Sequence, residues 1–222
     1  MVYLKLLLTA LLWGGTFVAA RIVAQQADPL SASFLRFFIA SFFLYILVLK
    51  QHGALPKLSR RLAIIVVLLG MSGVAAYNIF FFQGLKTIQA SRASLIVATN
   101  PVFIALFSVL LFREKVRGIG IVGIIMCLAG AVTVITRGNP LDIISGGIGS
   151  GELFIVGCVA SWVVYSLIGK VVMEDISPLS AVAYSCIIGT LGLLIPAVYG
   201  GMYPALVNYS AVYEVRTDEM RE

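Results

Sequence analysis

The chain has 222 residues, of which 60% are hydrophobic and only 12% are charged, and its formal net charge is +6 at pH 7. Soluble domains contain about 45–50% apolar and about 25% charged residues. The composition therefore excludes an ordinary soluble domain of this size, and the apolar surplus indicates a chain that crosses a membrane.

Long apolar runs follow one another along the chain, and the short connections between them hold most of the charge. Each run can cross about 30 Å of hydrocarbon as an α-helix. Because lipid offers no partner to backbone polar groups, the spans are predicted to be helices and the fold class to be all-α, a polytopic membrane protein with about seven transmembrane helices. The runs are residues 4–24, 30–49, 62–83, 93–112, 118–136, 151–172 and 178–200.

The distribution of Lys and Arg predicts on which side of the membrane each connection lies. A cytoplasmic N-terminus puts nine of them inside and four outside, if Arg36 within a span and the arginines beyond residue 200 are left out. We therefore expect a multi-pass protein of the cell (inner) membrane with its N-terminus in the cytoplasm. The inside set is Lys5, Lys50, Lys57, Arg60, Arg61, Arg113, Lys115, Arg117 and Lys170, and the outside set is Arg21, Lys86, Arg92 and Arg137.

Residue types that carry catalysis are scarce. The single histidine, His52, lies in a basic connection, and the three cysteines lie inside apolar runs without a C-x-x-C spacing. No acid stands in the middle of a span, so the sequence offers no evident proton-coupling site there. We predict that the protein is not an enzyme and needs no cofactor or metal. The scattered basic residues also argue against a nucleic-acid partner.

A tetrapeptide, PLSA, occurs at residues 29–32 and again at 178–181, which is an offset of 149 residues. The same offset places Trp13 on Trp162 without a gap. The offset predicts a unit of five spans that begins again at the sixth span. Because five is an odd number, the second unit would cross the membrane in the opposite direction to the first, as in the inverted repeats of many secondary transporters. The predicted domains are a first repeat over residues 1–137, the start of a second over 150–200, and a non-membrane tail over 201–222. Each proline is expected at the first position of a helix.

Polar or bulky side chains deep in the spans are the candidates for substrate binding. Arg36 either binds an anion or extends toward the membrane surface. Asn100 either bonds the backbone carbonyls that the kink at Pro101 leaves free or contacts a substrate. The two tryptophans either line a cavity or pack, and buried tyrosine and asparagine either contact substrate or bond between helices. The candidates are Trp13, Arg36, Tyr77, Asn78, Asn100, Trp162 and Tyr165.

Four stretches resemble the EamA family of the drug/metabolite transporter superfamily. They are LLLTALLWGGTFVAAR at 6–21, DPLSASFLRF at 28–37, the run from 90 to 135 with its mid-helix proline and Gly-rich end, and GELFIVGCVASWVVYSLIGK at 151–170. The resemblance implies ten helices in two inverted halves, a central cavity and alternating access. It implies an inner-membrane secondary transporter that moves amino acids or related compounds, drugs or other small metabolites, with efflux as the expected direction.

The chain departs from that pattern because it has seven spans rather than ten. We interpret residues 201–222 as an aberrant or truncated end, so that transport is expected of a ten-helix parent. The alternative is a non-transporting membrane fragment or scaffold. The expected partners are the lipid bilayer and a small-molecule substrate, and a homodimer that completes the cavity is a further hypothesis.

Overall fold

The computed structural model describes residues 2–26, 28–113, 118–135, 138 and 149–199, which form helices and, within this part, no strand. The predicted tail, 201–222, lies outside the described residues. The elements are α1 (Val2–Gln26), α2 (Pro29–His52), α3 (Arg60–Gly70), the π-helix η1 (Met71–Ala76), α4 (Tyr77–Thr87), α5 (Ala90–Val97), α6 (Asn100–Phe112), α7 (Gly118–Ile135), α8 (Ser150–Val172) and α9 (Pro178–Ala197).

The predicted all-α polytopic fold is confirmed. Six helices of the described part are long and apolar enough to cross a membrane. The fifth predicted span corresponds to α7, of which Gly118–Gly130 counts as a shorter apolar helix. The six long spans are Tyr3–Gln25, Pro29–His52, Arg60–Thr87, Ala90–Phe112, Ser150–Val172 and Pro178–Ala197.

The repeated tetrapeptide opens a helix in both places. Pro29 and Pro178 are the first residues of α2 and α9, where the missing N–H of proline costs nothing. Just before the prolines, the Asp28 carboxylate accepts from the Ser31 amide at 2.7 Å, and the Ser177 hydroxyl accepts from the amide three residues on at 3.2 Å. Both helices thus begin with a side-chain cap that satisfies an otherwise unpaired backbone donor.

Two of the spans are not regular α-helices. The third consists of α3, η1 and α4 in sequence, so that a π-helical segment lies in its middle. The fourth is interrupted between α5 and α6, directly before Asn100 and Pro101. The proline was expected to break this helix, and Asn100 was one candidate to bond the freed carbonyls. At the break, Thr99 donates to the Ile96 carbonyl through its hydroxyl, at 2.6 Å, and through its amide, at 3.1 Å.

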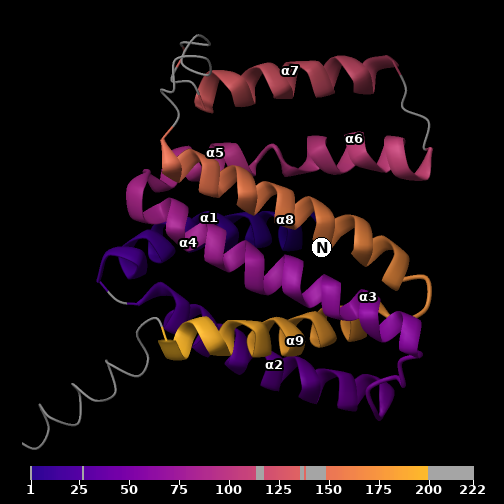
Figure 1. The fold of residues 1–222 in the computed structure, drawn as a ribbon. Helices are drawn as coiled ribbons and strands as arrows, with labels where there is room; N and C mark the ends of the chain where they lie inside the picture. Colours follow the sequence, from indigo (N-terminus) through magenta and orange to yellow (C-terminus); the bar gives the residue numbers. More distant parts are fainter. Residues whose placement is uncertain (1, 27, 114–117, 136–137, 139–148, 200–222) are drawn as a thin grey trace, which may run out of the picture.

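Helices α8 and α9 lie in the interior of the bundle, where they pack against most of the other helices. In Figure 1, α7 lies at one edge and α2 at the other, with α4 and α8 between them. α8 packs against α3, η1, α4, α5 and α6, while α9 packs against α2, α3 and η1. Glycines let these helices approach closely: a Cβ on Gly189 of α9 would lie 2.8 Å from the Gly70 carbonyl oxygen.

Long-range hydrogen bonds sort the helix ends into two groups. On one side, Arg21 at the end of α1 donates to the carbonyls of Leu85 and Ile88 at the end of α4. On the same side, Ser31 near the start of α2 donates to the Ala197 carbonyl at the end of α9, at 3.3 Å.

On the other side, Ser177 before α9 lies 3.2 Å from the His52 ring at the end of α2. The Tyr184 hydroxyl donates to the Pro56 carbonyl at 2.6 Å, which ties α9 to the connection before α3. These contacts agree with the predicted alternation of the connections. The direction of the whole bundle relative to the cytoplasm stays a prediction.

Candidate functional site

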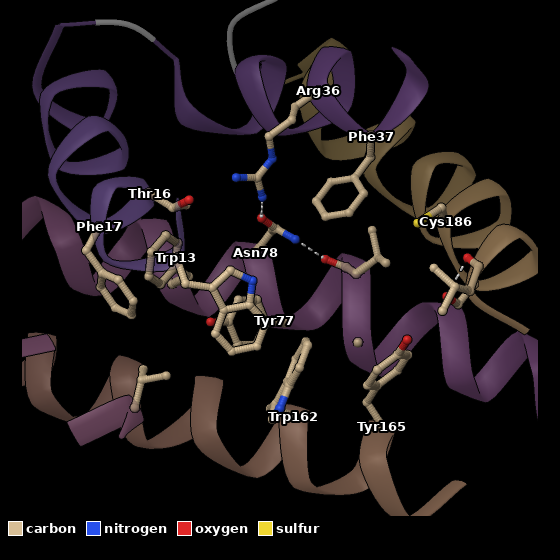
Figure 2. Close-up of a pocket in the computed structure, with 16 residues that line it drawn as sticks. Trp13, Thr16, Phe17, Arg36, Phe37, Tyr77, Asn78, Trp162, Tyr165 and Cys186 are labelled. Atoms are coloured by element: carbon tan, nitrogen blue, oxygen red, sulfur yellow. Dashed lines mark hydrogen bonds between the residues drawn. The ribbon is translucent and has the colours of Figure 1, made fainter. Parts of the chain in front are cut away.

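A cavity of about 330 Å³ lies among α1, α2, the η1–α4 segment, α8 and α9, and we call it the aromatic cavity. Figure 2 shows the side chains that point toward it. Six of the seven residues selected from the sequence line it, although they come from four separate spans. They are Trp13, Arg36, Tyr77, Asn78, Trp162 and Tyr165.

Aromatic rings form one wall of this cavity. Trp162 stands in its middle, with ring centroids 5.6 Å from Trp13, 5.3 Å from Tyr77 and 5.1 Å from Tyr165. The Trp13 and Trp162 rings meet edge to face, an arrangement that aromatic pairs prefer. The tryptophans therefore pack on each other and line the cavity at once, and 56% of Trp13 stays exposed.

Arg36 and Asn78 form a short polar chain on another wall. The Arg36 Nη2 donates to the Asn78 Oδ1 at 2.7 Å, and the Asn78 Nδ2 donates to the Val74 carbonyl at 2.6 Å. The guanidinium carbon also lies 4.7 Å from the centre of the Phe37 ring, a cation–π contact. Asn78 is fully buried, so this chain fixes where the guanidinium stands at the edge of the cavity.

The π-helix η1 shapes the floor of the cavity. Such segments are rare and occur often at functional sites. Gly73, in the middle of η1, faces the ring of Tyr165, and a Cβ there would lie under 3.0 Å from several ring carbons. The absent side chain is thus what lets Tyr165 lie against the helix. Beyond η1, Tyr77 and Asn78 follow directly and enter the cavity.

Asn100 is the one selected residue that the structure does not bring to this cavity. It starts α6, where only 6% of it is exposed, and its Oδ1 has no hydrogen-bond partner in the described part of the chain. Its role as a substrate contact stays a prediction.

Several lining residues were missed by the sequence analysis, although the 149-residue offset points to three of them. Thr16 is offset by 149 from Tyr165, Ser185 from Arg36, and Cys186 from Phe37, and every one of these six residues lines the cavity. Serine, threonine and cysteine in apolar runs carry no signal of their own, because they are common packing residues in membranes. Applying the repeat offset to each candidate would have found Thr16 and Ser185, but not Cys186, because Phe37 was not a candidate.

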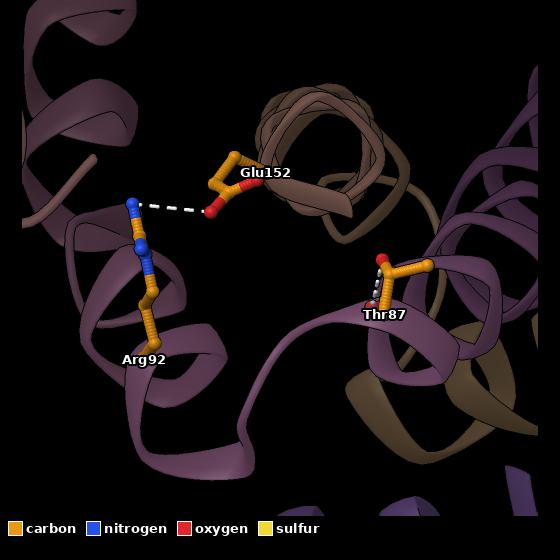
Figure 3. Close-up of polar contacts among 4 residues, drawn as sticks. Thr87, Arg92 and Glu152 are labelled. Atoms are coloured by element: carbon orange, nitrogen blue, oxygen red, sulfur yellow. Dashed lines mark hydrogen bonds and ion pairs between the residues drawn. The ribbon is translucent and has the colours of Figure 1, made fainter. Parts of the chain in front are cut away.

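A second polar cluster lies away from the cavity, where α5 and α8 begin (Figure 3). Arg92 Nη2 and Glu152 Oε1 are 3.1 Å apart, and only 2% of the Glu152 side chain is exposed. Glu152 stands in the first turn of α8, where the helix dipole favours a negative charge. From the sequence both residues read as ordinary charges at span ends, and the ion pair was not predicted. The burial of Glu152 and the absence of both residues from the lining of the aromatic cavity fit a structural role.

Comparison with known proteins gives a consistent family. The model of the EamA-like transporter family matches residues 1–136 and 149–212. The uncharacterized transporter YyaM of Bacillus subtilis (strain 168) is 27% identical over 207 residues, which cover 93% of this chain and 68% of that protein. An uncharacterized transporter of Archaeoglobus fulgidus is 30% identical over 200 residues, with 90% of this chain and 68% of the relative covered.

A further relative is the uncharacterized inner membrane transporter YhbE of Escherichia coli (strain K12). It is 27% identical over 175 residues, which cover 77% of this chain and 54% of YhbE. No solved structure matches the chain. The family match covers all six long spans of the described structure, and the chain therefore belongs to the EamA-like transporter family of membrane transporters.

Proposed function

We propose that the protein is a secondary carrier that binds a small metabolite in the aromatic cavity and moves it across the inner membrane by alternating access, in the direction of efflux. The strongest support is that one cavity is lined by six of the polar or aromatic residues that the sequence analysis selected for their depth in the spans. A non-transporting scaffold would have closed these positions by direct packing. Amino acids and related compounds are the starting class for the substrate.

The proposed carrier has two inverted halves, the first over residues 1–137 and the second beginning over 150–200. Two contacts join residues that the 149-residue offset equates: the ring pair of Trp13 with Trp162, and Ser41 with Thr190, whose hydroxyl oxygens are 3.3 Å apart. In a two-fold arrangement, residues beside the axis contact their own equivalents. The aromatic cavity would then lie on the axis, where rocking of one half against the other exposes it to each side in turn.

A matched pair of variants tests whether the cavity is the binding site. Thr16 lines the cavity and Thr9 does not, yet both lie on α1 and both donate their hydroxyl to the carbonyl four residues earlier. Thr16→Trp should fill the cavity, while Thr9→Trp should leave it open.

The purified full chain is screened for metabolites that raise its thermal unfolding temperature, because a ligand that binds the folded state stabilises it. We expect metabolites that stabilise the wild type and Thr9→Trp but not Thr16→Trp. Equal stabilisation of all three proteins would show that binding occurs elsewhere. Uptake and release of such a metabolite by vesicles that hold the ten-helix parent in known orientation then tests carriage and its direction.

The proposed orientation has its own test. Single cysteines at Gln25 and Gln51, both exposed and at opposite ends of the bundle, are placed in a chain without its native cysteines. A membrane-impermeant thiol reagent added outside intact cells should label position 25 and not position 51. Labelling of position 51 alone would reverse the orientation, and labelling of both would contradict the alternation of the spans.

A further inference from the structure

We infer that the aromatic cavity selects organic monoanions, which carry a planar aromatic group and one carboxylate but no ammonium group. This inference rests on the proposed function, since it assigns a substrate class to the same cavity. It narrows the proposed substrates from amino acids and related compounds to the related compounds that have the carboxylate of an amino acid but lack its amino group.

The charge of the cavity is the first argument. Among the described residues that line it, Arg36 is the only one with a charged side chain. Glu152 pairs with Arg92, and among the described residues no carboxylate pairs with Arg36. A charge at a membrane-embedded site is costly unless it has a partner. A bound anion would supply the missing counter-charge.

The orientation of the guanidinium is the second argument. A guanidinium only donates and a carbonyl only accepts, so Asn78 must turn its oxygen to Arg36 and its amino group to Val74. Asn78 therefore holds Arg36 in place without neutralising it. Only one of the five guanidinium N–H groups is used in this bond, and the rest of the planar fork suits the two oxygens of a carboxylate.

The opposite wall provides the third argument. Figure 2 shows Trp162 across the cavity from Arg36, with Tyr77 between them. The ring faces and edges around Trp162 offer stacked and edge-to-face contacts to a further ring. The volume of about 330 Å³ is at the low end of the roughly 300–1,000 Å³ of ligand pockets, which favours a compact molecule of one or two rings.

Cations and zwitterions are disfavoured by the same geometry. An aromatic cage alone would attract an ammonium group through cation–π contacts. Here, however, the Arg36 charge shares the cavity, and none of the lining residues that the structure describes has a carboxylate to hold an ammonium. An α-amino acid bound through its carboxylate would bring its ammonium close to Arg36, where like charges repel.

Three ligands with the same phenyl ring test the inference: 3-phenylpropanoate, phenylalanine and phenethylamine, whose net charges differ. The purified full chain in lipid nanodiscs is titrated with each by calorimetry at neutral pH. We expect 3-phenylpropanoate to bind roughly ten- to a hundredfold more tightly than either of the others, the range that a hydrogen-bonded charge partner provides.

Variants then assign the preference to Arg36. Arg36→Gln should make the three affinities alike, and Arg36→Lys should keep a weaker preference for the anion because it lacks the planar fork. Asn78→Asp should abolish the preference while Arg36 is retained, because it provides an internal counter-charge. Arg61→Gln, an exposed position outside the cavity, should bind as the wild type does.

Each outcome separates the two proposals. Similar affinities for all three ligands, lost in Thr16→Trp, would overturn the charge selection while the cavity remains the binding site. Anion binding that Thr16→Trp does not weaken would overturn the proposed function itself. Failure of folded wild type to bind the anion, or an anion preference that survives both Arg36→Gln and Asn78→Asp, would overturn the inference alone.

Discussion

The helix pairs α1–α2 and α8–α9 are equivalent by the 149-residue offset, yet their surroundings differ. Within the described structure, 6% of the α1 span and 11% of the α2 span are buried, against 39% for α8 and 44% for α9. All four helices are long and apolar enough to cross a membrane. Apolarity therefore indicates that a helix lies in the membrane, while its neighbours decide whether lipid or protein covers it.

Glycines show the same contrast at the level of single atoms. Gly14 and Gly15 of α1 have nothing within 4 Å of a Cβ built on them. A Cβ on Gly151 or Gly189, in α8 and α9, would collide with a neighbouring helix. Gly151 and Gly189 are thus required by close packing, whereas the glycines of α1 border open space in the described part of the chain.

The largest expected effect on stability comes from comparing two positions that the 149-residue offset equates, Glu152 in α8 and Tyr3 in α1. Glu152→Ala removes the buried carboxylate that pairs with the partly exposed Arg92, and we expect it to lower the free energy of unfolding by about 3–5 kcal/mol. Tyr3→Ala changes a side chain that is 87% exposed, and we expect little effect. Denaturant titration in mild detergent measures both.

The matched control for that prediction is the double variant Arg92→Met with Glu152→Leu. Because it removes both charges together, it should recover much of the stability that Glu152→Ala loses. A loss of equal size in Glu152→Ala and Tyr3→Ala would contradict the contrast between the two helix pairs.

An intermediate effect is expected from adding the same side chain to a glycine of each pair. Gly189→Leu overfills the contact of α9 with α3 and η1, and it should cost about 1–3 kcal/mol of unfolding free energy. Gly14→Leu enters open space and should stay within about 0.5 kcal/mol of the wild type. Thermal unfolding followed by intrinsic fluorescence compares them, and similar shifts would show that α1 is as tightly packed as α9.

The smallest effect concerns the hydrogen bond that joins α2 to α9. The Thr190 hydroxyl donates to the Cys186 carbonyl at 2.6 Å, so Ser41 must be the donor in the Ser41–Thr190 bond. A double-mutant cycle with Ser41→Ala and Thr190→Val should give a coupling energy of about 0.6 kcal/mol, the average for such bonds in membranes. The pair Thr9→Val and Thr190→Val, which makes no contact, serves as the control. If the coupling energy is no larger than that of the control, the Ser41–Thr190 contact does not support the proposed two-fold axis.

The spans and the starts of α2 and α9 could be predicted because their signals are local. A long apolar run indicates a span, and proline after a capping side chain indicates the first turn of a helix. The aromatic cavity could be anticipated in part, since Trp13, Arg36 and Asn78 are conspicuous in apolar runs. Their depth suggested a shared site, and the structure brings them together.

Other features could not be predicted because they depend on distant partners. The segment Met71–Ala76 has no residue pattern that distinguishes a π-helix from an α-helix. Arg92 and Glu152 lie 60 positions apart, and each alone looks like a solvated charge at a span end. The role of Asn78 also follows from its contacts, because an asparagine in a span does not reveal that it holds an arginine of another helix.

The π-helix η1 has a consequence for changes in the length of the chain. An α-helix turns by about 100° per residue, so a deletion within α4 would rotate every later residue of the span away from its neighbours. A π-helical turn holds about one residue more, because its hydrogen bonds join residues five apart. Loss of one residue within Met71–Ala76 could therefore be absorbed as a regular α-helix, with α3 and α4 keeping the faces that they present to α8 and α9. The third span thus contains a place where one residue can be lost without turning either of its ends, although the floor of the cavity beside Gly73 would change.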